Sequence, residues 1–136
     1  MRRVIATLAL LGAAGGVQGE PAIQDEPLLV FQRICNIERG QDDAADALAR
    51  DWEELVRSSF PGAEMTVTTG RWMTGFQNIE RPFNQILIRE RHLDAEMRQD
   101  FTDLLMADEG FRALQRKMLD VVDFGTCTET QFRERP

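Results

Sequence analysis

Four short segments of the chain have the apolar and polar patterns of β-strands. Seven of the ten residues of 28–37 are apolar, with β-branched and aromatic side chains among them, which is typical of a buried strand. In 65–74, threonines alternate with larger side chains, the two-residue period of a half-buried strand. The segments 83–91 and 124–132 have strand composition too. Pro82 suits the first position of the third strand, where no ladder N–H is needed.

Two further segments carry apolar residues at helical spacing. In 44–59 these residues recur with charged residues between them, and Asp42 or Asp43 is expected to cap this helix. A second helix follows Asp94, its predicted N-cap, and is interrupted at 107–110 before its apolar face resumes. The predicted order is β-α-β-β-α-β, the ferredoxin-like α+β plan, with both helices on one face of an antiparallel sheet.

The N-terminal residues have the composition of a secretory signal peptide. Arg2 and Arg3 give a positive start, 4–17 is an uncharged apolar run, and the small residue Gly19 precedes the expected cleavage point. The run is shorter than the roughly 20 residues of a membrane span, although an uncleaved anchor is the alternative. A periplasmic or secreted protein is therefore expected. The predicted parts are a signal peptide over 1–19, a lead-in over 20–27, a single domain over 28–132 and a tail over 133–136.

The two cysteines are predicted to form a disulfide. Cys35 lies in the first predicted strand and Cys127 in the last, and an even pair in an exported protein favours a bridge. These two strands are neighbours in the ferredoxin-like plan, so the fold and the disulfide support each other. Two buried free thiols are the alternative. A bridge over so long a loop is expected to stabilise the fold by about 4 kcal/mol.

The charge of the chain excludes one class of partner. The formal net charge is −7 at pH 7, and loss of Arg2 and Arg3 with the signal peptide takes it to about −9. Lys117 is the only lysine. Nucleic acids are held largely by cations that replace phosphate counterions, so nucleic-acid binding is not expected. No segment after the signal peptide is long and apolar enough to span a membrane.

The predicted strands carry apolar residues on both faces. In the first strand, Phe31 and Cys35 lie on one face and Val30 and Ile34 on the other, and 83–91 shows the same pattern. Helices cover one face only, and soluble monomers seldom expose a large apolar patch. The second face is therefore expected to pack against the sheet of a second copy, which predicts a homodimer.

Three stretches of the sequence resemble a known superfamily. They are a strand followed by ERGQDDAADALARDW, the stretch GRWMTGFQNIERPFNQILIRER, and the interrupted helix DAEMRQDFTDLLMADEGFRALQ. From about residue 28 to 132 the chain resembles the dimeric α+β barrel superfamily, within it the NIPSNAP-like and antibiotic-biosynthesis-monooxygenase-like (ABM-like) proteins. The resemblance implies a dimeric barrel, with a ligand pocket between sheet and helices or inside the barrel. Members include cofactor-independent monooxygenases, haem-degrading enzymes and small isomerases.

Haem degradation is not expected from this resemblance. The haem-degrading members depend on an asparagine in the first strand, a tryptophan in the second helix and a histidine further along it. Asn36 matches the first of these, but Leu104 falls near the tryptophan position and no histidine follows.

Five residues between 70 and 92 are candidates for a site. His92 is the only histidine and the candidate for catalysis, with a solvated or capping histidine as the alternative. Arg71 and Arg89 could hold a ligand carboxylate or pair with acidic neighbours. Trp72 could stack on a flat ligand or pack in the core. Asn84 could orient a ligand or complete a turn with its amide satisfied.

No metal site and no cofactor are predicted. Asp42, Asp43 and Asp46 cluster at the start of a helix, but they lack the alternating ligands and the glycine of a calcium loop. One histidine and two oxidised cysteines do not supply a zinc site.

Three functions remain open from the sequence. The first is an exported, dimeric barrel protein that binds a small apolar or aromatic ligand, with no specific reaction deducible. The second is a cofactor-independent monooxygenase or isomerase, in which His92 or Arg71 polarises the ligand. The third is an envelope protein-interaction module whose acidic surface meets a basic partner.

Overall fold

The computed structural model describes residues 27–74 and 79–135, and describes no side chain between 72 and 83. The predicted signal peptide over 1–19 and most of the predicted lead-in lie outside these residues, as does Pro136.

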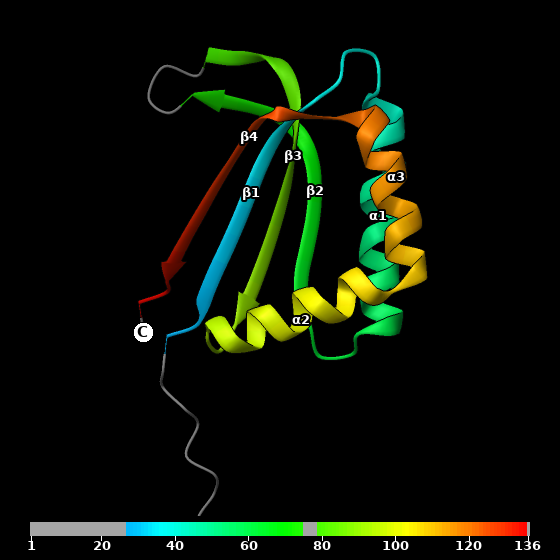
Figure 1. Ribbon diagram of the computed structural model, residues 1–136. Coiled ribbons are helices and arrows are strands. Elements are labelled where there is room, and N and C mark those ends of the chain that lie inside the picture. The colour runs from blue at the N-terminus through cyan, green and yellow to red at the C-terminus, as the bar shows by residue number, and fades with distance from the viewer. Residues whose placement is uncertain (1–26, 75–78, 136) are drawn as a thin grey trace, which may run out of the picture.

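The described chain forms a sheet of four strands with three helices on one of its faces (Figure 1). The elements are β1 (Leu29–Ile37), α1 (Asp42–Ser59), β2 (Glu64–Thr74), β3 (Ile79–His92), α2 (Ala95–Ala107), α3 (Glu109–Val121) and β4 (Val122–Arg133). The strand order is β2-β3-β1-β4, and every neighbouring pair is antiparallel. This order confirms the predicted ferredoxin-like α+β fold.

The third strand starts earlier than the sequence pattern predicted. β3 begins at Ile79, so Pro82 lies inside the strand and not at its first position. The pairing of β3 with β1 covers only residues 85–92, and the pairing with β2 shifts register between Arg71 and Met73. Pro82 therefore lies where β3 has no β1 neighbour and beside an irregular part of β2, which are the places that tolerate proline in a sheet.

The interruption predicted in the second helix divides it into α2 and α3. Asp108 has extended backbone angles, and its side chain accepts a hydrogen bond from the backbone N–H of Phe111 at 2.8 Å. α3 runs alongside α1, whereas α2 crosses near the ends of the strands (Figure 1). A Cβ on Gly110 would lie 2.6 Å from Cδ1 of Leu55, so glycine permits the close approach of α3 to α1.

The predicted caps are right for one helix and wrong for the other. Asp94 is the N-cap of α2, and its side chain accepts from the backbone N–H of Met97 at 2.8 Å. The N-cap of α1 is Gln41, which makes no side-chain cap bond. Asp42 and Asp43 lie instead in the first turn of α1, where the positive end of the helix dipole favours carboxylates.

The hydrophobic core lies between the sheet and the helices. Trp52 of α1 is 3% exposed, and its ring centroid lies 5.2 Å from that of Phe111 in α3. The sheet contributes Ile86 and Ile88 from β3. Other members of the core are Cys35, Ile37, Ala45, Leu48, Ala49, Val56, Val67, Phe101, Leu105, Leu114, Met118, Val121 and Val122.

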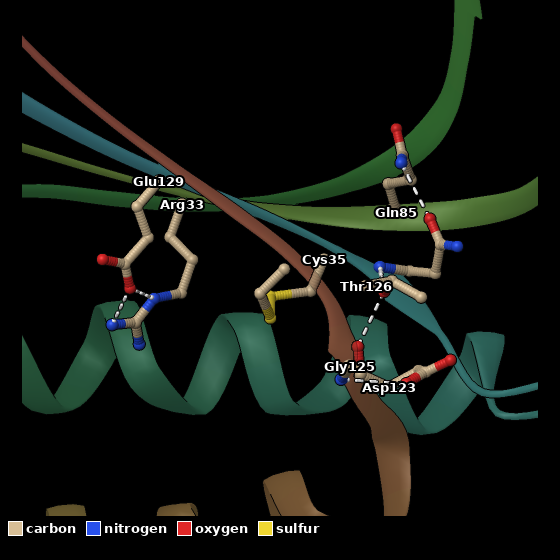
Figure 2. The surroundings of a disulfide bond; sticks show 9 residues. Arg33, Cys35, Gln85, Asp123, Gly125, Thr126 and Glu129 are labelled. Carbon is tan, nitrogen blue, oxygen red and sulfur yellow. Dashed lines mark hydrogen bonds and ion pairs between the residues drawn. A yellow bond between two sulfur atoms is a disulfide. The ribbon is translucent and has the colours of Figure 1, made fainter.

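The predicted disulfide is confirmed. Cys35 of β1 and Cys127 of β4 are bonded across 92 positions of sequence (Figure 2). The bond lies where the pairing of β1 with β4 shifts register between Ile34 and Asn36. Beside it the backbone N–H of Asn36 donates to Oγ1 of Thr126 at 2.9 Å (Figure 2). The cross-link therefore holds an edge strand to the centre of the sheet at an irregularity of the ladder.

The face of the sheet away from the helices is apolar along its centre and polar at its edges. Ile34 of β1 lies opposite Leu87 of β3, and both are half-buried. Thr128 of β4 lies opposite Ile34, and Thr68 of β2 lies opposite Leu87. The sequence pattern of β1 and β3 predicted the apolar centre, and the edge strands add threonines on either side.

Candidate functional site

A cavity of about 260 Å³ lies between the sheet and all three helices. Every strand and every helix contributes to its lining, and most of the lining residues are apolar. The lining residues are Phe31, Arg33, Trp52, Met65, Ile88, Glu90, Arg98, Thr102, Leu105, Met106, Phe111, Gln115, Met118, Leu119 and Phe124. This volume is slightly below the roughly 300–1,000 Å³ of typical ligand pockets, so the cavity suits a small molecule.

Charged side chains gather at one end of this cavity. Glu90 lies on β3 and is 7% exposed. Nε of Arg98 in α2 lies 3.4 Å from Oε2 of Glu90, and Cζ of Arg98 lies 3.8 Å from the ring centroid of Phe31. A guanidinium at this distance from an aromatic face makes a cation–π contact. The packing therefore fixes Arg98 against the cavity wall beside a carboxylate.

His92 lies behind Glu90 on the same strand. Its Nε2 is 3.1 Å from Oε2 of Glu90, and the residue is 5% exposed. The imidazole ring centroid lies 5.5 Å from that of Phe101. His92 is therefore not solvated. It is not a helix cap either, because Asp94 is the N-cap of α2. A catalytic role for His92 stays a prediction.

His92 also faces a second, more open hollow of about 430 Å³. This hollow lies between the loop after α1, the end of β3 and α2, and its lining includes Phe60, Phe101 and Leu104. The Glu90–His92 pair therefore connects the wall of the inner cavity with the wall of the outer hollow.

The other predicted site residues are not brought together with His92. Arg71 and Asn84 are register partners near the opposite end of the sheet, and Nδ2 of Asn84 donates to Oδ1 of Asp42 at the start of α1. Arg89 points to the face away from the helices, where its Nη2 lies 3.1 Å from Oε1 of Glu134. The side chain of Trp72 lies outside the described residues. None of Arg71, Asn84 and Arg89 lines the inner cavity.

Sequence reasoning missed Glu90 and Arg98. One signal for Glu90 was available, because it alternates with Ile88 and His92 on the side of β3 that carries core residues. A carboxylate on a buried face needs a charged or hydrogen-bonding partner. No comparable signal pointed to Arg98, which joins the group only through the packing of α2 against β3.

An ion-pair network lies on the opposite face of the sheet. Oε2 of Glu134 accepts from Nη2 of Arg91 at 2.8 Å, and Nη1 of Arg91 lies 2.6 Å from Oε2 of Glu64. The hydrogen bond from Arg91 lowers the pKa of Glu134, and the same bond raises the pKa of Arg91. Arg89 also contributes to the lowered pKa of Glu134 through its charge.

Acid is expected to remove the contribution of Glu134 to stability. Its pKa is lower in the folded chain than its ordinary value of 4.5, so the contribution is present above that value and is lost as pH falls through the folded pKa. Urea unfolding at about pH 6 and about pH 3 should show a smaller loss for Glu134→Gln than for the parent protein. Glu109→Gln is the control, because Glu109 is 94% exposed. Equal losses in parent and Glu134→Gln would contradict the prediction.

Within the described part of the chain, no helix has the length and apolar character needed to cross a membrane. The same residues contain no group of three or more histidine, cysteine, aspartate or glutamate side chains placed to hold a metal ion.

Comparisons with known proteins place the fold. No protein-family model matches the sequence, and no curated protein matches it. A NIPSNAP family protein of unknown function from Agrobacterium tumefaciens is similar in structure, with a TM-score of 0.57 and 15% identity over 80% of this chain and 89% of that one. A second NIPSNAP family protein from the same organism gives a TM-score of 0.58 and 14% identity over 81% of this chain and 88% of the other.

An ABM-like protein from Bacteroides thetaiotaomicron has the same fold, with a TM-score of 0.50 and 14% identity over 82% of this chain and 91% of that one. Identities this low establish a shared fold and no shared reaction. The chain has the α+β fold of the NIPSNAP and ABM-like proteins.

Proposed function

We propose that this chain is an exported, homodimeric binding protein that holds a small, largely apolar ligand between its sheet and its helices. The observation that carries the proposal is the inner cavity of about 260 Å³, with mostly apolar walls and a charged end formed by Glu90 and Arg98. Ligand sites commonly combine an apolar wall with a few convergent polar groups. The fold alone would not support this function, because proteins of one fold have many functions.

The disulfide and the N-terminal composition support export. Cys35 and Cys127 are bonded, and stable disulfides are typical of oxidising compartments. The positive start and the apolar run over 4–17 have the order of a signal peptide. A periplasmic or secreted location accounts for both features.

The face of the sheet away from the helices supports a second copy. Ile34 and Leu87 form a half-buried apolar centre there, and Phe132 of β4 is 43% exposed. A two-fold arrangement would pack this stripe against itself, with the threonines of the edge strands around it. The superfamily resemblance implies the same sheet-to-sheet arrangement.

Native mass spectrometry on protein purified from the periplasm tests the proposal. We expect a mass of two chains with an added small molecule, which is released under denaturing conditions, and chains lighter by the two hydrogens of a disulfide. Thr102→Phe, which adds volume inside the cavity, should remove the small molecule and leave the dimer. Asp103→Phe, at the next and exposed position of α2, should retain it. A monomer without added mass would contradict the proposal.

A second candidate function is a cofactor-independent isomerase. The buried Glu90–His92 pair, with 3.1 Å between Oε2 and Nε2, favours it, because a carboxylate at a cavity wall with an imidazole behind it can accept and pass on a proton. An isomerase would exchange a C–H proton of its ligand for solvent deuterium, and Glu90→Gln would stop the exchange. A protein that only binds would show no exchange.

A further inference from the structure

Two buried N–H groups at the inner cavity have no hydrogen-bond acceptor among the described residues. They are Nε1–H of Trp52 and Nε–H of Arg98, and both residues line the cavity. Buried polar groups in proteins nearly always have a partner, and an unpaired one calls for an explanation. Two such donors from different helices at one cavity indicate that the cavity holds an acceptor.

The side chains of both donors are held in place by their neighbours. Trp52 is 3% exposed and packs against Phe111 at 5.2 Å between ring centroids. The guanidinium of Arg98 is held over Phe31 at 3.8 Å and beside Glu90 at 3.4 Å. A contact of 3.4 Å between Nε and Oε2 is long for a charge-assisted hydrogen bond, so Glu90 balances the charge of Arg98 and leaves its Nε–H available.

The charge at this end of the cavity decides what kind of acceptor fits. The carboxylate of Glu90 already compensates the guanidinium of Arg98. A ligand carboxylate would add a second negative charge beside Glu90, while Arg33, the other cation of the lining, is already paired with Glu129. An uncompensated charge in an apolar site is strongly unfavourable. A neutral carbonyl oxygen accepts the same hydrogen bonds and adds no charge.

We infer that the ligand is a neutral, mostly apolar carbonyl compound, whose oxygen atoms accept hydrogen bonds from Nε1 of Trp52 and Nε of Arg98. This inference rests on the proposed function, because it assigns the chemical class of the ligand in the same cavity. The apolar walls hold the carbon skeleton, and the two donors orient the carbonyl end.

Three probes of equal shape separate these possibilities by isothermal titration calorimetry. They are 2-acetylnaphthalene, a neutral ketone; 2-isopropenylnaphthalene, in which a CH₂ group replaces the carbonyl oxygen; and 2-naphthoate, an anion. The ketone is expected to bind about tenfold more tightly than the hydrocarbon, the net effect of one or two hydrogen bonds gained on binding. The naphthoate is expected to bind more weakly than the ketone.

Variants assign this preference to the two donors. Trp52→Phe and Arg98→Lys should each reduce the advantage of the ketone and leave the affinity for the hydrocarbon almost unchanged. Arg98→Lys keeps the charge opposite Glu90, so it tests the guanidinium donor even if Trp52→Phe folds poorly. Arg112→Lys is the control, because Arg112 is exposed on α3 and does not line the cavity.

The indole N–H of Trp52 gives a readout that does not depend on affinity. In ¹⁵N-labelled protein its signal, assigned by its loss in Trp52→Phe, should move downfield with the ketone and not with the hydrocarbon. Equal affinity for ketone and hydrocarbon would overturn the inference and leave the proposed function standing. Tightest binding of the naphthoate would overturn the neutral class. Failure of all three probes to bind would overturn both.

Discussion

Replacing Cys35 and Cys127 together by alanine is expected to lower the free energy of unfolding by about 4 kcal/mol. The bond joins residues 92 positions apart, so its loss gives the unfolded chain a large amount of conformational freedom. Cys35 is 1% exposed. Alanine is chosen over serine because a serine here would bury a hydroxyl group without a hydrogen-bond partner. Urea unfolding under oxidising conditions, followed by circular dichroism, measures the change.

Reduced parent protein is the control for the disulfide prediction. It keeps both sulfur atoms and loses only the covalent link, so its free energy of unfolding should fall close to that of the double alanine variant. A double variant within about 1 kcal/mol of the oxidised parent would contradict the prediction. It would mean that the irregular pairing between β1 and β4 is held without the cross-link.

Replacing Arg98 by alanine is expected to lower the free energy of unfolding by about 3 kcal/mol, the lower end of the range for breaking a buried ion pair. The side chain of Glu90 is 9% exposed and that of Arg98 is 23% exposed, so the carboxylate would remain buried without its cation. The contact of the guanidinium with Phe31 would be lost as well. Urea unfolding of the purified variant measures the effect.

A double-mutant cycle shows whether the effect comes from the unpaired charge. Glu90→Gln combined with Arg98→Ala should be more stable than Arg98→Ala alone, because the amide still meets His92 and carries no charge. The coupling between the two positions is expected to exceed about 1 kcal/mol. Arg33→Ala should cost less than about 1 kcal/mol, since the side chains of Arg33 and Glu129 are 35% and 50% exposed. Strictly additive effects of the two cavity changes would contradict the role given to Glu90.

The two effects arise in different states of the chain. The disulfide acts mainly by restricting the unfolded chain, whereas Arg98 acts in the folded chain by balancing a charge at the cavity wall. The carboxylate of Glu90 at the cavity wall is therefore unfavourable for stability unless Arg98 is beside it. Such groups are often retained for a function of the site, which agrees with the ligand proposed for this cavity.

Strand parity explains why the predicted site residues do not converge. Arg89 lies one position from Glu90 and three from His92 on β3, so it must point to the opposite face of the sheet. Arg71 and Asn84 share a register position near the other end of β3. The sequence interpretation grouped these residues because they are close along the chain, but a side chain in a sheet is placed by its face and its register.

The amino-acid sequence by itself determined the order of strands and helices, the cap at Asp94, the break near Asp108 and the pairing of Cys35 with Cys127. These features depend on local periodicity, on capping chemistry and on the neighbours that one topology allows. Only the tertiary structure decided the candidate site, because Phe31, Trp52, Glu90 and Arg98 come from four different elements. Their meeting depends on how α2 crosses the sheet and how closely α3 packs on α1, and no local sequence pattern specifies those packing distances.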